Sequence, residues 1–392
     1  MLICILRQFR VSFLYLVMRT TSTRLQNFRN HVDTQVEWAP HMNVIIGPNG
    51  AGKTNLIDAI HYLCMTRSFI STSDIYVVNQ DATFFMIKGH FEGNIRASFD
   101  VGCSYSRGEG KKIFVNESPL DRLSDLIGMV PVVVLAPQDK KLTSEGPAER
   151  RSFIDSFISQ ISPRYLKDLL DFRKARKQRN KLLQEFHGSR EVMLAYLEPW
   201  NVQLVEYGSR IVAKRTEVLN QFRDYLAKEY ELISGMRHKP HLEYQTFCEP
   251  SEDVKVVQDR YREELEKALD NELEREITTV GPHRDEIVFY LDDFELRKFG
   301  SQGQHRLFAL ALKLAQLFYF SDELDDLPIF LLDDVFGDLD AQRTDVLLNA
   351  LIEHAGQTFI TSANPIPFDD YVTFDGTKNR KYRVDQGKVE ML

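Results

Sequence analysis

The sequence predicts an α/β fold in which a parallel core is accompanied by an antiparallel β subdomain and an inserted helical lobe. Solid apolar runs such as Met42–Ile46 and Ile329–Leu332 are typical of buried central strands. Segments between Thr83 and Val115 alternate apolar and polar residues, as half-exposed antiparallel strands do. Helical periodicity dominates from Ala148 to Asn271, which indicates a helical lobe between two α/β parts.

Strands of both kinds are predicted in the first third of the chain. A strand over Thr21–Phe28 and a hairpin partner over Gln35–Trp38 precede the core strand. After a helix that ends near Met65, we expect strands over Thr83–His90, Asn94–Val101, Lys111–Val115 and, fully buried, Pro131–Ala136. We therefore assign residues 18–136 to the first part of the α/β lobe.

The helical lobe is assigned to residues 137–275. We expect breaks near Pro163, near Glu198-Pro199 and around Gly235–Pro250, and no extended coiled coil, because no long heptad run is present. Residues 276–392 return to alternating strands and helices. These are predicted over Glu286–Leu291, Ser301–Phe320, Ile329–Leu332, Gln342–His354 and Thr358–Thr361.

The composition is that of an ordinary soluble globular protein. The 392 residues carry a net charge of −8, with 43% hydrophobic and 27% charged residues. A surface coated in positive charge is excluded, whereas one local basic face is not, because nucleic-acid binding depends on local charge. The cysteines Cys4, Cys64, Cys103 and Cys248 form no C-x-x-C pair. We therefore expect neither a disulfide framework nor a zinc site, and a cytoplasmic location fits.

Residues 1–17 differ in character from the rest. They are apolar but interrupted by Arg7 and Arg10, too short to span a membrane, and without a small-residue cleavage site. Met18 lies directly before the first predicted strand. We expect translation to start at Met18, residues 1–17 to be an upstream extension, and the protein to have no membrane association.

A phosphate-binding pattern, G-x-x-x-x-G-K-[ST], follows the first core strand and precedes a helix. Backbone N–H groups of such a loop and the N-terminus of the helix surround phosphate oxygens. Lys53 is expected to reach the β- and γ-phosphates, and Thr54 to hold Mg²⁺. The predicted nucleotide-binding residues are Gly47, Pro48, Asn49, Gly50, Ala51, Gly52, Lys53 and Thr54.

An acid pair, Asp333-Asp334, ends the buried run Ile329–Leu332. Ligands of open parallel sheets bind at the C-terminal ends of the strands. We expect Asp333 to reach Mg²⁺ directly or through water, and Asp334 to polarise the attacking water. The plain alternative, an acidic turn after a core strand, is disfavoured by the phosphate loop upstream.

The tetrapeptide Ser301-Gln302-Gly303-Gln304 opens the helix before the acidic strand. Serine and glycine at a helix start are typical of an N-cap, but the free N–H groups there also bind anions. Because the chain has its own phosphate loop, we expect Ser301 and Gly303 to contact the nucleotide of a second copy.

The segment Tyr165–Leu183 is markedly basic. Two interpretations stay open, a solvated helix face and a contact with DNA phosphates. The candidate DNA-binding residues are Arg173, Lys174, Arg176 and Lys177.

Together these motifs resemble the ABC-type ATPase heads, and among them the bacterial RecF recombination-mediator family. Ser301–Gln304 resembles the ABC signature and Asp333-Asp334 the Walker B pair, while Thr361-Ser362 stands where transporters have a switch histidine. Other matching segments are Leu25–Asn30, Ala136–Asp139, Arg150–Asp155, Gly281–Glu286 and the D-loop Phe336–Asp340. The resemblance implies that Gln138 is the Q-loop glutamine and that Asp340 contributes to the nucleotide site.

The resemblance implies an ATP- and Mg²⁺-dependent DNA-binding protein that dimerises head to tail around two ATP molecules. It implies slow, DNA-stimulated ATP hydrolysis, with Lys53, Gln138 and Asp334 in catalytic roles. The implied DNA is single-stranded, gapped or a junction. The implied partners are RecO and RecR, with which family members place RecA during replication and repair.

Other functions use the same motifs. An SMC-like or break-repair head carries a long coiled coil between the phosphate loop and the signature, where this sequence predicts a compact lobe. A nuclease of the overcoming-lysogenisation-defect type needs an acidic metal-binding domain after the ATPase, and a transporter subunit needs a coupling interface. A passive ATP-gated DNA clamp with negligible hydrolysis stays open.

Overall fold

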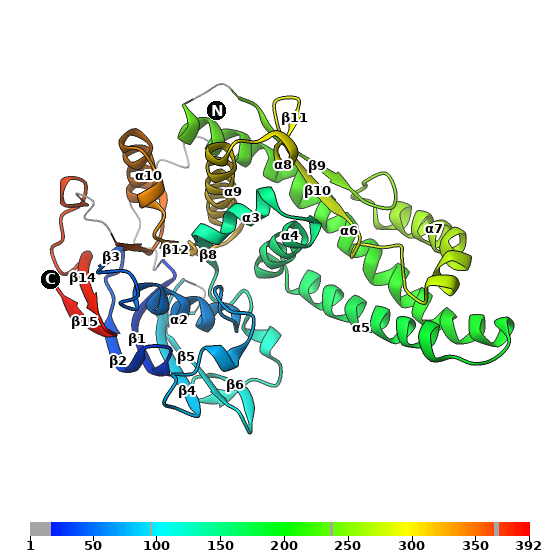
Figure 1. Cartoon of the computed structure of the whole chain (residues 1–392), viewed down its shortest axis with the longest axis horizontal. Helices are drawn as coiled ribbons and strands as arrows, with labels where there is room; N and C mark the ends of the chain where they lie inside the picture. The colour runs from blue at the N-terminus through cyan, green and yellow to red at the C-terminus, as the bar shows by residue number, and fades with distance from the viewer. Residues whose placement is uncertain (1–16, 95, 236–237, 364–367) are drawn as a thin grey trace. The chain divides into compact units, whose positions relative to one another are not determined.

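The computed structural model (Figure 1) describes residues 17–94, 96–235, 238–363 and 368–392, and only the backbone of Asp338. Apart from Val17, the predicted upstream extension lies outside these residues. The chain divides into two compact units, one ending at Ala136 and resuming at Phe320–Leu392, the other Pro137–Tyr319. The second unit extends past the predicted limit at residue 275 because a strand before that limit pairs with one after it.

An antiparallel sheet forms one layer of the first unit. In spatial order its strands are β2 (His31–Glu37), β1 (Arg19–Phe28), β4 (Phe84–Glu92), β5 (Phe99–Ser106), β6 (Gly110–Val115) and β7 (Ser118–Pro119). The alternating pattern therefore predicted this sheet correctly. The strand predicted over Asn94–Val101 was placed too early, since Phe91 pairs with Phe99 and the Gly93 N–H donates to the Arg96 carbonyl (3.0 Å) in the turn between them.

A second sheet of the first unit is parallel except at one edge. Its order is β15 (Lys388–Met391), β14 (Asn379–Asp385), β3 (Met42–Ile46), β13 (Thr358–Ser362), β12 (Ile329–Asp333) and β8 (Val132–Leu135), with only β15 antiparallel. The apolar runs predicted β3, β8, β12 and β13. The strand β14 was missed because its charged residues, such as Arg380 and Lys381, interrupt any apolar run.

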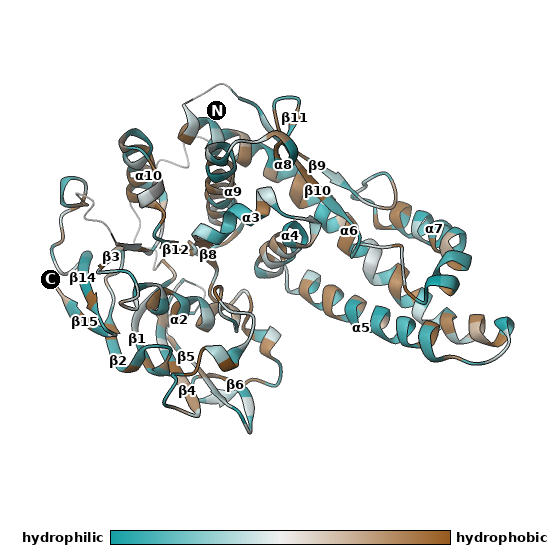
Figure 2. Cartoon of the chain, viewed as in Figure 1, coloured by the Kyte–Doolittle hydropathy of each residue, from teal (hydrophilic) through white to brown (hydrophobic). Residues whose placement is uncertain are grey.

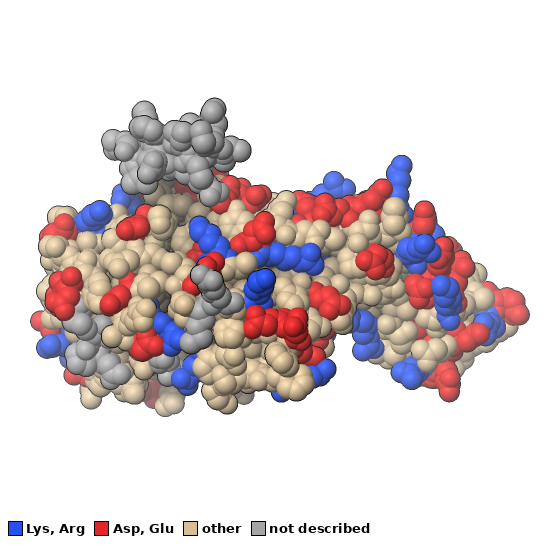
Figure 3. Space-filling view, turned by 90° about the horizontal axis from the view of Figure 1, so that it is seen from above, with Lys and Arg blue, Asp and Glu red and all other residues tan. Residues whose placement is uncertain are grey.

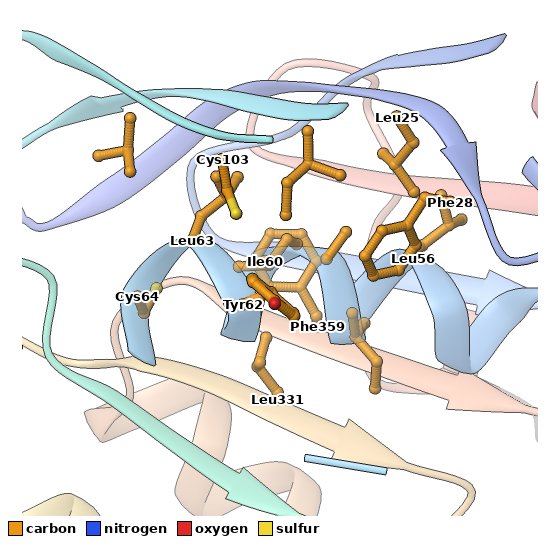
Figure 4. Close-up of a cluster of buried hydrophobic side chains, with 14 of the residues drawn as sticks. Leu25, Phe28, Leu56, Ile60, Tyr62, Leu63, Cys64, Cys103, Leu331 and Phe359 are labelled. Carbon is orange, nitrogen blue, oxygen red and sulfur yellow. The ribbon is translucent and has the colours of Figure 1, made fainter. Parts of the chain in front are cut away.

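The helix α2 (Lys53–Met65) lies between the two sheets and packs against strands of both. Figure 4 shows Leu56, Ile60 and Leu63 of this helix among side chains such as Phe28 and Leu331. A helix that is apolar on all sides is stable only when it is buried all round. Each fully buried Leu or Ile contributes roughly 1.5–3 kcal/mol relative to exposure, so this layer holds the phosphate-loop helix firmly.

The remaining helices of the first unit are short or lie near its C-terminal strands. They are α10 (Ala341–His354), the end of α9 (Gln302–Glu323), and the 3₁₀ turns η2 (Asp74–Tyr76), η3 (Leu123–Leu126), η5 (Phe336–Asp338) and η6 (Phe368–Asp370). None of the helices in the described ranges is both long and apolar enough to cross a membrane.

The second unit is mainly helical. Its helices are η4 (Pro137–Lys140), α3 (Lys141–Ser144), α4 (Pro147–Ile161), α5 (Pro163–Glu185), α6 (Arg190–Ser234), α7 (Val254–Arg275), α8 (Leu296–Phe299) and most of α9. A small antiparallel sheet has the order β11 (Phe294–Glu295), β10 (Glu286–Leu291), β9 (Pro240–Gln245). The helices α5, α6 and α7 lie side by side (Figure 1), and hydrophilic and hydrophobic residues alternate along α5 (Figure 2).

The helix break predicted at Glu198-Pro199 was wrong. Helix α6 is continuous from Arg190 to Ser234 with Pro199 inside it. Proline has no N–H to donate to the carbonyl four residues earlier, which normally disfavours a helix interior. Here Leu197 and Leu204 are fully buried on either side of the proline, and tertiary packing of this kind overrides local propensity.

A buried arginine ties four elements of the second unit together. Arg215 of α6 is 1% exposed and pairs with Asp155 of α4 (2.8 Å) and Asp285 before β10 (2.7 Å). Tyr165 of α5 donates to Asp155, and Tyr244 of β9 donates to Asp285. Because both carboxylates are fully hydrogen-bonded, the charge of Arg215 is compensated inside the protein.

Candidate nucleotide-binding site

The phosphate loop needs glycine at two positions for different reasons. A Cβ at Gly47 would lie 2.2 Å from the carbonyl oxygen of Val384 in β14, so only glycine lets the loop pass this strand. Gly52 has φ +114°, a conformation that other residues rarely adopt. The sequence folds locally as strand, tight loop and helix because these two positions carry no side chain.

The N-terminus of α2 is left open for an anion. Gly52 is its N-cap and no side chain caps it, so first-turn N–H groups are available to a ligand. Lys53 is 6% exposed and its Nζ donates to the carbonyl oxygens of Gly47 (2.8 Å) and Pro48 (3.0 Å). Burial lowers the pKa of Lys53, while Asp334 and Asp333 oppose that shift.

Thr54 and Asp333 meet across the sequence. The Thr54 hydroxyl donates to Asp333 Oδ1 (2.7 Å), which also accepts from the hydroxyl of Thr361 (2.7 Å). Burial raises the pKa of Asp333, and the bonds from Thr54 and Thr361 oppose this. A hydroxyl and a carboxylate at this distance fit Mg²⁺, which takes few protein oxygens and fills its octahedron with phosphate oxygens and water.

The position of the transporter switch histidine is thus used differently. Thr361 bonds Asp333, and its hydroxyl accepts from the N–H of Asp334 (3.0 Å). Asp334 has φ +49°, and its Oδ1 accepts from the N–H of Ala363 (3.2 Å). A constrained backbone of this kind is common at functional sites.

Asp334 reaches the phosphate loop through a shared pocket. The pocket is lined by Asn49, Gly50, Gly52, Lys53, Thr54, Asn55 and Asp334. The structure therefore brings together the two motifs that the sequence predicted as halves of one site. A lysine, open helix N–H groups and two carboxylates at one pocket can hold a phosphate chain, a divalent cation and a water to be activated.

Three residues that support the loop were missed at the sequence level. Asn30 donates to the Ala51 carbonyl (2.9 Å) and accepts from Asn55 (2.7 Å). His31, fully buried in β2, contacts the carbonyl oxygens of Gly52 (3.1 Å) and Gly387 (3.0 Å). Nothing in the local pattern identifies them, although Asn30 lies in a segment that matches the RecF pattern.

Ser301 and Gly303 lie at the start of α9, in the second unit. Ser301 Oγ accepts from the Gln304 N–H (3.2 Å) and Gln304 Oε1 from the Ser301 N–H (2.8 Å), which is a capping box. Gly303 is exposed, and a Cβ there would meet nothing within 4 Å. Packing within the chain therefore does not require this glycine, although glycine in a helix costs about 1 kcal/mol.

The two remaining predicted site residues are placed as follows. Gln138 lies in η4 of the second unit. Asp340, in the first unit, is the N-cap of α10, and its carboxylate accepts from the Arg343 N–H (2.9 Å) and pairs with the Arg343 guanidinium (2.6 Å). The structure does not bring Asp340 into the pocket described above.

The basic segment forms the long helix α5. Arg173, Lys174 and Lys177 are exposed, whereas Arg176 is half-buried. Arg173 also lies 3.4 Å from Asp155. The four candidate residues therefore do not share one environment.

The fold and the site define a P-loop ATPase head of the ABC type. Residues 20–384 match the family described as RecF/RecN/SMC N terminal domain. The chain is 43% identical over 369 residues to the DNA replication and repair protein RecF of Salinibacter ruber, covering 93% of this chain and 89% of that protein. It therefore belongs to the RecF family.

Further relatives agree with this assignment. The RecF protein of Chloroherpeton thalassium is 39% identical over 351 residues, covering 88% of this chain and 95% of that protein. A structure described as recombination mediator protein RecF–ATP in the RecFOR pathway has a TM-score of 0.88 at 30% identity, covering 97% and 99% of the two chains. An Smc head from Pyrococcus furiosus shares the fold alone, with a TM-score of 0.56 at 14% identity.

Proposed function

We propose that the chain binds ATP and Mg²⁺ at the phosphate loop, with Lys53 on the β- and γ-phosphates and Thr54 and Asp333 on the cation. The observation that carries the proposal is the 2.7 Å bond from Thr54 to Asp333, which joins the ends of two parallel core strands. The relative solved with ATP in its description supports the choice of nucleotide. Asp334, and by resemblance Gln138, orient the water that attacks the γ-phosphate.

The active form is a head-to-tail dimer with two ATP molecules between the subunits. Each nucleotide contacts Lys53 and Thr54 of one subunit and Ser301 and Gly303 of the other. The open surroundings of Gly303 support this arrangement, because a helix start without a side chain lets a phosphate approach the N–H groups closely. Asp340 adds a contact of the D-loop after the subunits have met.

The dimer is a DNA-binding protein of replication and recombinational repair. It binds single-stranded, gapped or junction DNA in the cytoplasm and, with RecO and RecR, helps to place RecA there. Relatives named as replication and repair proteins support this role. Acidic and basic side chains are intermixed on the face seen in Figure 3, which favours local phosphate contacts over one broad basic surface.

ATP hydrolysis is slow, is stimulated by DNA, and times release. The acid pair and the nucleotide pocket support an active enzyme over a passive ATP-gated clamp, because Asp334 lines the same pocket as Lys53. The clamp would need the pocket to bind ATP but no group to activate water.

One experiment tests the dimer, the DNA binding and the turnover together. The full chain is sized by sedimentation velocity without ligand, with ATP and Mg²⁺, and with ATP, Mg²⁺ and gapped DNA, while phosphate release is followed in parallel. We expect a monomer, a dimer, and a DNA-bound dimer whose hydrolysis is faster than without DNA. A monomer under all three conditions overturns the shared site, and a DNA-bound dimer without phosphate release identifies the passive clamp.

A further inference from the structure

Four arginines from three separate segments gather in the second unit. Arg151 belongs to α4, Arg173 and Arg176 to α5, and Arg284 to the turn between Gly281 and β10. We call these four residues the arginine cluster. Two of them, Arg151 and Arg284, lie outside the basic segment that the sequence singled out.

Specific contacts hold the cluster together. Arg151 Nη1 donates to the carbonyl of Asp285, the residue next to Arg284. The His283 ring lies 5.9 Å from that of Phe172, so the turn carrying Arg284 rests on α5. Arg176 is four residues after Phe172 and therefore extends from the same side of α5. The turn itself is fixed by the bond from the Arg284 N–H to the Gly281 carbonyl (2.9 Å).

The neighbouring carboxylates are already engaged by other arginines. Asp155 and Asp285 are bound by the buried Arg215. Glu286 accepts two bonds from Arg150, at 2.8 and 2.9 Å. Arg173 reaches Asp155 only at 3.4 Å, and neither Arg176 nor Arg284 forms an ion pair through its side chain with any residue in the described ranges. The cluster is therefore left with excess positive charge.

The groups inside the cluster register this excess. Burial, followed by Arg173, Arg284 and Arg151, lowers the pKa of Arg176. Burial and the positive charge of Arg176 lower the pKa of His283 to about 3, so its imidazole is neutral. The ring contacts the Thr278 carbonyl through Nε2 (3.1 Å), while Nδ1 is buried without a partner among the described residues. Like charges held this close destabilise one another unless an anion joins them.

We propose that the arginine cluster is a binding site for a backbone phosphate of DNA. The inference rests on the DNA-binding function proposed above and specifies where one phosphate is held. Guanidinium groups bind phosphate oxygens in pairs, and arginines from three segments enclose a phosphate better than a row of side chains on one helix. A phosphate contact reads no base, so the site contributes affinity without sequence preference.

The test compares two double variants of equal charge. Arg176→Gln with Arg284→Gln removes two cluster charges, and Lys181→Gln with Lys267→Gln removes two exposed charges of the same unit that pair with Glu185 and Glu264. Binding to a fluorescein-labelled duplex is followed by anisotropy, with ATP, over a series of salt concentrations. The cluster variant should bind about tenfold more weakly, with a slope of log K against log salt smaller by about 1. The control variant should stay near wild type.

The outcomes distinguish this site from the proposed function. Equal weakening in both double variants means that only net charge matters and overturns the cluster, while DNA binding by the protein stands. A wild-type protein that does not bind DNA overturns both. Arg176→Lys with Arg284→Lys keeps the charge and loses the guanidinium, so an intermediate affinity is expected, and this variant decides the matter if the glutamine variant does not fold.

A second measurement needs no substitution. Phenylglyoxal modifies accessible arginines, and mass spectrometry reports which positions react with and without DNA. DNA should protect Arg176 and Arg284 but not Arg262, which is exposed on α7 and paired with Asp259. Protection of the cluster by poly-glutamate and not by DNA identifies an acidic protein segment as the ligand and overturns the proposal.

Discussion

Lys53 is buried between the phosphate loop and two carboxylates, and its ammonium donates only to backbone carbonyls. Lys53→Ala removes the charge that pairs with the phosphates, so we expect the affinity for ATP to fall about a hundredfold or more. ATP-driven dimerisation should be lost with it. Isothermal titration calorimetry and sedimentation check both effects, with Lys112→Ala, an exposed lysine of the same unit, as control. A variant that still dimerises with ATP removes Lys53 from its proposed role.

Asp334 offers a cleaner separation of binding from turnover. Asparagine keeps the size of the side chain, tolerates φ +49°, and its amide oxygen can still accept from the Ala363 N–H. Asp334→Asn should therefore fold and bind ATP, whereas hydrolysis falls about a hundredfold or more because the water loses its base. The dimer should then persist in ATP. Phosphate release at the wild-type rate would assign the base to another residue.

At the level of elements, the turn between β1 and β2 supports the phosphate loop. Asn30→Ala removes one bond to the Ala51 carbonyl and one from Asn55. We expect ATP affinity to fall about tenfold, as for two lost hydrogen bonds of roughly 1 kcal/mol each, partly compensated by water. Gln35→Ala, at an exposed site of the same strand β2, is the control and should bind normally. Equal affinities in the two variants would show that the loop holds its shape without the turn.

The start of α9 combines a structural cap with the proposed contact to a second subunit. Ser301→Ala removes the acceptor for the Gln304 N–H and costs about 1 kcal/mol of stability. Ser189→Ala removes the equivalent cap of α6 and serves as the matched control. We expect both to melt slightly earlier, but only Ser301→Ala, and more strongly Ser301→Arg, to weaken ATP-dependent dimerisation in sedimentation. Normal dimerisation of Ser301→Arg contradicts the shared site, and loss of ATP binding by the monomer would mean that the signature acts within one chain.

For the molecule as a whole, buried neutral histidines predict sensitivity to acid. The pKa of His283 is lowered to about 3 by burial and by Arg176, whereas in the unfolded chain it is about 6.5. The unfolded state therefore binds the proton first, and the stability contributed by neutral His283 is complete above about pH 6.5 and declines as pH falls toward the folded value. The decline is at most about 1.4 kcal/mol per pH unit.

His283→Gln should accordingly lose less melting temperature than wild type between about pH 7.5 and pH 5.5, because glutamine does not titrate. Circular dichroism at several pH values measures this difference. The control is His187→Gln at an exposed position, which should follow the wild-type curve. Parallel curves for all three proteins would mean that His283 keeps its ordinary titration in the folded state.

The sequence by itself determined the α/β class, the phosphate loop, the acid pair and the RecF resemblance. These are local features, since an apolar run, a glycine pattern or a tetrapeptide carries its physical meaning within a few residues. The same locality explains the errors. Pro199 lies inside α6, the strand predicted from Asn94 begins at Phe99, and the charged strand β14 was missed.

Only the tertiary structure decided which distant residues meet. It joined Thr54 to Asp333, placed Asn30 and His31 against the phosphate loop, and gathered Arg151 and Arg284 around α5. Such contacts depend on sheet order and on side chains packed from separate segments, and no spacing along the chain encodes them. The free energy of the site therefore comes from long-range packing, while its chemistry was already present in the motifs.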